Sequence, residues 1–78
     1  MEKERFFQSL HEFLDIKSIP ALEEATNIRG IEEFDSMMIL TIIAFVDDNF
    51  GVVLSADRLN TMKTVGDLMA MIGSEHFS

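Results

Sequence analysis

Apolar residues recur at helical spacing in the first part of the chain. Between residues 3 and 16 they fall at i, i+1, i+4, i+7 and i+8, which is one stripe at the 3.6-residue period: Phe6, Phe7, Leu10, Phe13 and Leu14. Polar residues occupy the opposite side. The pattern predicts an amphipathic helix over residues 3–16, and Pro20 disfavours helix in the residue before it, so the helix is expected to end before that point.

Residues 17–34 predict a long loop that packs onto the body of the protein. Within it, residues 21–25 are compatible with one turn of helix. Ile28, Ile31 and Phe34 are spaced to anchor the loop against a core. A loop of this length in so small a domain usually carries function or packs closely onto the fold.

A second helix is predicted over residues 36–50. Asp35 is a favoured N-cap residue, no Gly or Pro follows until Gly51, and Gly51 is a natural residue for a helix C-terminus. On a helical wheel Thr41, Asp47 and Asp48 share the side that faces water. The core stripe opposite them is expected to hold Ile39, Ile42, Ile43, Val46 and Phe50.

The same wheel leaves three apolar residues among the acidic ones, namely Met37, Leu40 and Ala44, with Met38 and Phe45 at the boundary. An exposed apolar strip flanked by carboxylates indicates a docking surface. Two other interpretations remain open: the loop 17–34 covers the strip, or the strip is the seam of a homodimer.

The remaining chain predicts a short helix and a last longer one. Ser55 is placed to cap a segment over 56–61, with Leu59 and Met62 turned inward, after an extended link at 52–54. Thr64 and Asp67 fit a capping box that starts a helix through Ile72. Residues 73–78 are expected to be a frayed tail. Together these elements predict one all-α domain over residues 1–78, a small four-helix bundle with three longer helices and one short one.

Composition narrows the classes of function. The 78 residues include 6 basic and 14 acidic ones, a net charge of −8, which argues against nucleic acids and anionic membranes as partners. The absence of cysteine excludes disulfides, zinc–thiolate sites and catalytic thiols of the chain itself. No apolar targeting segment is visible, and the longest apolar stretch, residues 37–46, is too short to span a bilayer. We expect a cytoplasmic monomer.

Ser36 stands at the first position of the second helix, where a hydroxyl is exposed and a phosphate is favoured by free N–H groups and the helix dipole. A serine beside an aspartate N-cap is also simply a good helix start. A hydrolase nucleophile is not indicated, because no G-x-S-x-G elbow surrounds it and the two histidines, His11 and His76, lie elsewhere. The chemical interpretation of Ser36 is therefore modification and not catalysis.

The run Asp35-Ser36-Met37 resembles the Asp-Ser-Leu motif of acyl carrier proteins. Asp47 and Asp48 follow eleven and twelve residues after the serine, as acidic residues do in that family. Phe50-Gly51, Thr64-Val65-x-Asp67 and Ile72 stand at the family's spacing, so the resemblance covers about residues 34–72 in register.

The resemblance implies that Ser36 carries 4′-phosphopantetheine from coenzyme A, with Asp35 as its flanking acid. The resemblance also implies that partner enzymes dock on the second helix. The partners would be a phosphopantetheinyl transferase that uses Mg²⁺, together with acyl-transfer enzymes, ketosynthases and related pathway enzymes that carry basic patches. The docking residues would be Met37, Met38, Leu40, Thr41, Ala44, Asp47 and Asp48. Met38 and Thr41 stand where acids are common in the family, which leaves a more apolar docking face. An acyl chain would enter a space lined by Ile39, Ile42, Ile43, Val46, Leu59, Met62, Leu68 and Ile72, or these residues form an ordinary core.

The cargo stays open at this point: fatty acyl, polyketide, aryl-polyene, aminoacyl and peptidyl carriers share this bundle and serine. A free-standing acyl carrier is favoured over an excised module of a larger synthase. The alternative from another class is a carrier-like bundle that is never modified and acts by binding a partner or a second copy. A metal site is disfavoured, because Asp47-Asp48-Asn49 lacks the alternating ligand spacing of a calcium loop.

Overall fold

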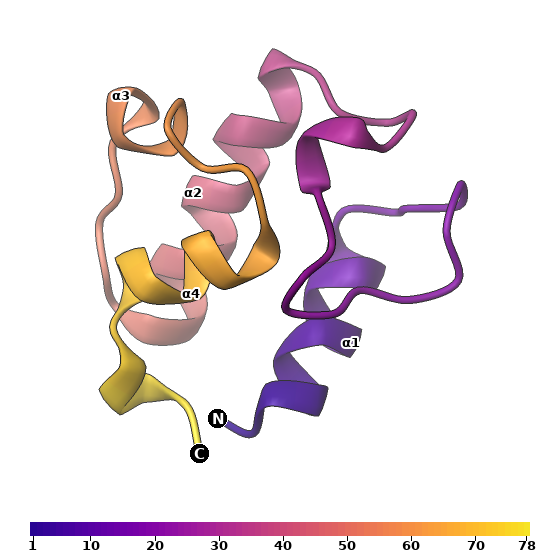
Figure 1. The fold of residues 1–78 in the computed structure, drawn as a ribbon. Coiled ribbons are helices and arrows are strands. Elements are labelled where there is room, and N and C mark those ends of the chain that lie inside the picture. Colours follow the sequence, from indigo (N-terminus) through magenta and orange to yellow (C-terminus); the bar gives the residue numbers. More distant parts are fainter.

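The longest helix, α2 (Ser36–Phe50), begins and ends where the sequence predicts. In the computed structural model, which describes all 78 residues, the Asp35 backbone is extended and its carboxylate accepts the N–H of Met38 at 2.9 Å. At the other end Gly51 adopts a φ of 67°, in the left-handed region that favours glycine, and its N–H bonds to the Asp47 carbonyl at 2.9 Å. Figure 1 shows α2 in pink through the middle of the molecule.

The first helix, α1 (Lys3–Phe13), is shorter than the predicted 3–16. The chain leaves the helix because Asp15 takes a φ of 53°, after which Ile16 turns inward and becomes buried. As a result only Phe6 and Leu10 of the predicted stripe are fully buried, while Phe7 and Leu14 are partly buried. Phe13, the last residue of the helix, is 49% exposed although it belongs to the predicted apolar stripe.

The other helices are α3 (Ala56–Leu59) and α4 (Val65–Ile72), with two 3₁₀ turns, η1 (Ile28–Gly30) and η2 (Ser74–His76). The short helix α3 is two residues shorter than expected, and residues 21–25 form no helix. The structure contains no strand, only an isolated bridge between Asn27 and Thr64. The predicted all-α bundle of three longer helices and one short helix is confirmed (Figure 1). None of its helices has the length and apolar character that crossing a membrane requires.

The long loop is fastened to the start of α4 by backbone hydrogen bonds. The N–H of Ile28 donates to Lys63, that of Val65 to Thr26, and that of Gly66 to Glu24, at 2.8 to 3.0 Å. Side chains of the loop also enter the core, where Leu22 and Ile28 are buried and Ile31 and Phe34 are partly buried. The loop therefore packs onto the body of the fold along its length.

All seventeen buried residues are hydrophobic and form one cluster. In α2 the buried residues are Met38, Ile39, Ile42, Phe45 and Val46. The wheel was wrong on two counts: Met38 and Phe45 lie inside and not at the boundary, and Ile43 and Phe50 are only partly buried. The shift has a physical cause, because the Phe13 ring at the end of α1 lies 5.2 Å from the Phe45 ring and covers that side of α2.

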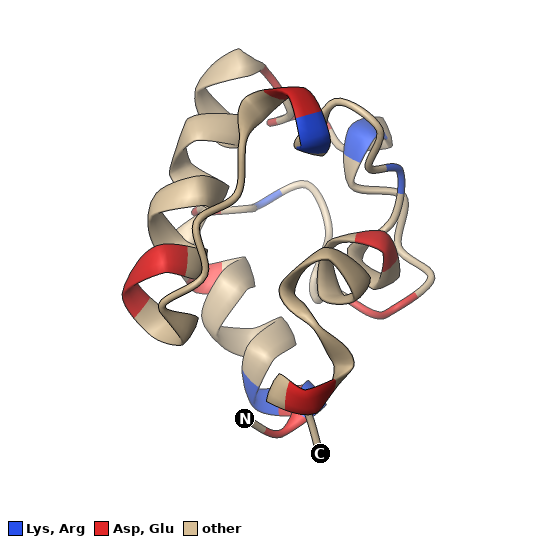
Figure 2. Ribbon diagram, turned by 90° about the vertical axis from the view of Figure 1, so that its left-hand side faces the viewer, with Lys and Arg blue, Asp and Glu red and all other residues tan.

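The C-terminal tail was expected to fray, and the structure corrects this. Residues 74–76 form η2, after which the Phe77 ring packs edge-on against Phe6 at 5.0 Å. The two termini lie side by side (Figures 1 and 2). The N-terminal amine donates to the His76 carbonyl at 2.7 Å, and the Ser78 N–H donates to the Met1 carbonyl at 3.1 Å. These contacts hold the tail across the base of the bundle.

Candidate functional site

Ser36 is the first residue of α2, and its side chain stands in solvent. It is exposed, and its hydroxyl makes no hydrogen bond within the protein. The backbone N–H groups of Ser36 and Met37 have no acceptor either. In the neighbouring Asp35, Oδ1 accepts the N–H of Met38 while Oδ2 has no partner. The helix start therefore presents a free hydroxyl, two free N–H groups and one free carboxylate oxygen.

The outer face of α2 is apolar near Ser36 and acidic toward the far end. Met37 is 65% exposed and Leu40 is 56% exposed, and Ala44, Asp47 and Asp48 are also exposed. The helix contains no basic residue, and Figure 2 shows its ribbon without blue. Thr41 is partly buried, and its hydroxyl donates to the Met37 carbonyl at 3.0 Å.

One residue predicted for docking is almost entirely buried. Met38 is 5% exposed and belongs to the core cluster. It was placed on the docking face by its position among the family's acidic residues, but in the structure it belongs to the side of α2 against which the Phe13 ring at the end of α1 packs. The other predicted docking residues remain accessible to different degrees.

The geometry of an exposed serine at an open helix start agrees with what comparison of the sequence finds. Residues 4–72 match the family model described as the phosphopantetheine attachment site. The chain belongs to this family of carrier proteins. Its prosthetic group is 4′-phosphopantetheine. No curated protein and no solved structure gives a significant match.

The residues at the start of α2 fit this prosthetic group. A phosphodiester on a serine needs a hydroxyl that is accessible and not committed to a hydrogen bond within the fold, which Ser36 provides. It also benefits from N–H groups without acceptors and from the positive end of a helix dipole, and α2 supplies both. The hydroxyls at the starts of α3 and α4 differ from that of Ser36, because Ser55 and Thr64 each accept a backbone N–H of their own helix.

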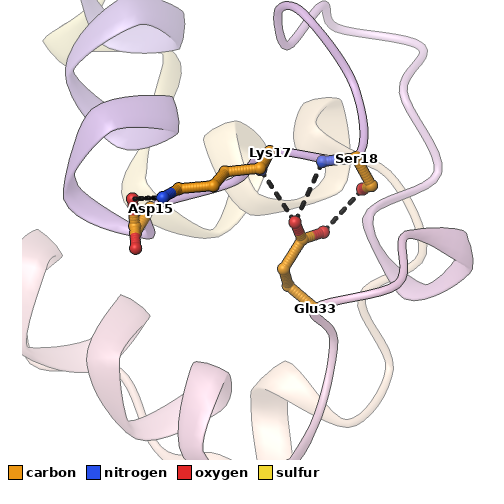
Figure 3. Close-up of polar contacts among 4 residues, drawn as sticks. All are labelled: Asp15, Lys17, Ser18 and Glu33. Carbon is orange, nitrogen blue, oxygen red and sulfur yellow. Dashed lines mark hydrogen bonds and ion pairs between the residues drawn. The ribbon is translucent and has the colours of Figure 1, made fainter.

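Two side chains of the long loop fix the segment that leads into Ser36, and sequence reasoning missed both. The first is Glu33 (Figure 3). Its carboxylate accepts the Lys17 N–H at 2.7 Å, the Ser18 N–H at 2.9 Å and the Ser18 hydroxyl at 2.6 Å. The Ser18 hydroxyl, and next the Lys17 N–H, lower the pKa of Glu33 to about 2. Glu33 thereby joins the turn after α1 to the residues just before α2.

The second is Arg29, which joins the loop to the end of α3. Its guanidinium donates to the carbonyls of Met62, Leu59 and Asn60, the last two at 3.0 and 2.6 Å, and lies 5.2 Å above the Phe34 ring. Such contacts satisfy carbonyls that a helix end leaves without partners. The sequence signal was an arginine in a loop rich in glutamate, and this signal did not indicate which groups the arginine would contact.

The residues predicted to line an acyl pocket are mutual neighbours in a packed core. All eight belong to or contact the core cluster, seven of them buried and Ile43 partly buried: Ile39, Ile42, Ile43, Val46, Leu59, Met62, Leu68 and Ile72. The hollows of the protein are at its surface and are lined by other residues. In this conformation the carrier therefore holds its apolar interior closed.

Proposed function

We propose that Ser36 is the residue to which 4′-phosphopantetheine is attached. The observation that carries the proposal is the state of its hydroxyl, which is exposed, free of hydrogen bonds and at the first position of a fifteen-residue helix. An exposed hydroxyl without a hydrogen-bond partner is accessible to a transferase. Asp35 is the flanking acid, and its cap holds the helix start in place.

Attachment is a transfer from coenzyme A catalysed by a phosphopantetheinyl transferase with Mg²⁺. The Ser36 oxygen forms a bond to the phosphorus that bears the pantetheine. The bond from that phosphorus to the bridging oxygen of the diphosphate breaks, adenosine 3′,5′-bisphosphate leaves, and the hydroxyl proton passes to the transferase or solvent. The product phosphodiester stands at the positive end of the α2 dipole, where a negative charge is stabilised.

The loaded protein would act as an acyl carrier in fatty acid, polyketide or related lipid biosynthesis. The prosthetic group supplies the thiol on which acyl chains are held as thioesters, and the chain has no cysteine of its own. The net charge of −8 supports partner enzymes with basic docking patches, since opposite charge speeds encounter, and a cytoplasmic location is part of the proposal. An aminoacyl or peptidyl cargo is the alternative within the same proposal. Because the core is packed, the cargo is proposed to travel on the arm and not in a preformed cavity.

The test is the intact mass of the chain after incubation with coenzyme A, Mg²⁺ and a broad-specificity phosphopantetheinyl transferase. We expect a gain of one phosphopantetheine in the wild type and in Ser55→Ala, and none in Ser36→Ala. Ser55 is the matched control because it also stands at a helix start, yet its hydroxyl accepts the Arg58 N–H at 3.2 Å. Ser36→Ala should keep the wild-type stability to within about 0.5 kcal/mol, since its hydroxyl makes no contact. No gain in the wild type, while a control carrier is loaded, would refute the proposal.

A further inference from the structure

The stretch between α2 and α4, residues 52–62, has few polar contacts with the rest of the protein and is called the α3 segment below. It runs along one side of the molecule from the end of α2 to α3 and the turn after it (Figure 1). Its backbone N–H groups donate within the segment or have no acceptor in the protein. Its two charged residues, Asp57 and Arg58, take part in no ion pair.

The chain is fixed immediately before and after the α3 segment. Before it, the Gly51 N–H donates to the Asp47 carbonyl at 2.9 Å. After it, the Lys63 carbonyl accepts the N–H of Ile28 at 3.0 Å, and the Lys63 N–H donates to the Asp67 carboxylate at 2.9 Å. A stretch that is fixed at both ends and loosely bonded between them can open while the rest stays folded, because only its own contacts have to break.

Arg29 makes every hydrogen bond that joins the α3 segment to the rest of the protein. Its guanidinium donates to the carbonyls of Met62, Leu59 and Asn60, and no backbone N–H reaches the carbonyls of Met62 and Asn60. The other attachment is apolar, through the buried side chains of Leu54, Leu59 and Met62. A planar guanidinium has several donors in fixed directions and therefore suits three carbonyls better than a lysine ammonium does.

The same guanidinium also contacts the residue that precedes the N-cap of α2. Its central carbon lies 5.2 Å from the centroid of the Phe34 ring. Phe34 is followed by Asp35, whose carboxylate accepts the N–H of Met38. The backbone of Arg29 is itself held in η1, where the Asn27 side chain accepts its N–H at 3.1 Å. One side chain with a fixed backbone thus contacts both the α3 segment and the entry to α2.

We propose that Arg29 is the latch of the α3 segment, which opens as a unit when the three hydrogen bonds break, and that Phe34 links this opening to the start of α2. When the segment leaves, the guanidinium loses its three acceptors and moves from the Phe34 ring into water. The coupling is reciprocal, so a change at Phe34 that frees the guanidinium favours opening. Opening uncovers the buried Leu59 and Met62. The inference does not depend on what is attached to Ser36.

Hydrogen exchange of single backbone amides, followed by NMR, tests the latch. The reporters are the N–H groups of Leu59 and Asn60, which are bonded inside the segment, and the reference is the N–H of the buried Val46 in α2. Arg29→Met keeps an apolar stem without donors, and we expect reporter exchange to rise about tenfold or more relative to the reference. Arg29→Lys should give a smaller rise. Arg58→Met is the matched control, since Arg58 is exposed in the same segment, and its effect should stay within about threefold.

The link to α2 is tested in both directions. Phe34→Leu removes the ring and keeps an apolar side chain, and we expect exchange at Leu59 and Asn60 to rise about threefold or more. Arg29→Met should raise exchange of the Met38 N–H by a similar factor. Adding Phe34→Leu to Arg29→Met should give no further rise at Leu59 and Asp57-to-Asn60 amides of the segment, because both changes act through one side chain.

Three results would overturn the inference. Reporter exchange in Arg29→Met that rises no more than exchange at Val46 would mean that Arg29 acts on the stability of the whole fold. A rise in Arg58→Met as large as in Arg29→Met would mean that the loss of any positive charge loosens the α3 segment. An unchanged Met38 N–H in Arg29→Met would mean that the segment opens without effect on α2.

Discussion

The starts of α2 and α4 each have a side-chain N-cap but differ in which N–H and hydroxyl groups they leave without a partner. At α4 the Thr64 hydroxyl accepts the Asp67 N–H at 3.1 Å, and Asp67 Oδ2 accepts the N–H groups of Lys63 and Thr64 at 2.9 and 3.1 Å. The N–H groups of Val65 and Gly66 donate to the long loop. At α2 a single side-chain cap joins Asp35 to Met38, and the Ser36 hydroxyl and two N–H groups stay free.

The difference separates a helix start whose first N–H groups are bonded within the fold from one whose first two N–H groups have no acceptor in the protein. The N-terminal N–H groups of a helix must find acceptors in the protein, in water or in a bound group. At α4 they are used to fasten the long loop to the bundle. Before α2 the loop makes two such contacts: the Ser18 hydroxyl donates to Glu33, and the Arg29 guanidinium lies above the Phe34 ring. Neither contact involves Ser36. The contacts are placed around Ser36 and not on it.

The largest expected effect on stability comes from adding a side chain at the start of α4, where the long loop packs. A Cβ at Gly66, the second residue of α4, would lie 3.1 Å from the Glu24 carbonyl oxygen and 3.2 Å from Glu24 Cγ. We expect Gly66→Val to lower the free energy of unfolding by about 1–3 kcal/mol. Met37→Val changes the second residue of the open α2 start, and we expect a change within about 0.5 kcal/mol. Urea unfolding measures both, and equal losses would mean that the two starts are packed alike.

Removing the two caps should separate stability from function. We expect Thr64→Ala and Asp35→Ala each to lower the free energy of unfolding by about 1 kcal/mol, because each loses one N-cap hydrogen bond. Loading by the transferase should stay normal in Thr64→Ala and become slower in Asp35→Ala. Thermal unfolding and loading rates measured side by side check this. Slow loading in both variants, in proportion to their stability, would contradict the division between the two starts.

Acid should weaken the hydrogen bonds that Glu33 makes to the loop and those that Asp67 makes at the start of α4. The pKa of Glu33 is lowered from 4.5 to about 2, chiefly by the Ser18 hydroxyl. The pKa of Asp67 is lowered from 3.8, chiefly by the Lys63 N–H and next by that of Thr64. Since both folded values are depressed, the carboxylates contribute stability above their ordinary pKa values, and this contribution is lost as the pH falls below them.

We therefore expect the wild type to exceed Glu33→Gln in urea midpoint at pH 6. The difference should decrease as the pH falls from 4.5 toward 2, and Asp67→Asn should behave in the same way below 3.8. Ser74→Ala serves as the control, because it removes an exposed hydroxyl and no carboxylate. A difference between the wild type and Glu33→Gln that is the same at pH 6 and pH 2 would mean that the carboxylate charge contributes nothing to the contact.

The local signals of the sequence predicted the helix ends well. Asp35, Gly51 and the Thr64–Asp67 capping box act through hydrogen bonds that span at most four residues. The helix ends that they determine can therefore be predicted from neighbouring residues in the sequence. The same holds for Ser55 at the start of α3. These signals were enough for the bundle and for the position of Ser36 at a helix start.

The errors fall where distant segments decide the outcome. Helix α1 ends early at Asp15, and Met38 and Phe45 are buried because the end of α1 packs against that side of α2. A helical wheel treats each helix alone and cannot include such a neighbour. The contacts of Glu33 with Ser18 and of Arg29 with Asn60 cross about fifteen and thirty residues, and Phe77 meets Phe6 from the opposite end of the chain. None of these has a local signature.

The most direct test of the account is to locate the added mass along the loaded chain. The protein is incubated with coenzyme A, Mg²⁺ and the transferase, then digested, and the modified peptide is sequenced by tandem mass spectrometry. The account predicts that the phosphopantetheine is on Ser36 and on none of the other serines, Ser9, Ser18, Ser55, Ser74 and Ser78. A group found on one of those residues, or a chain that takes up none, would contradict it.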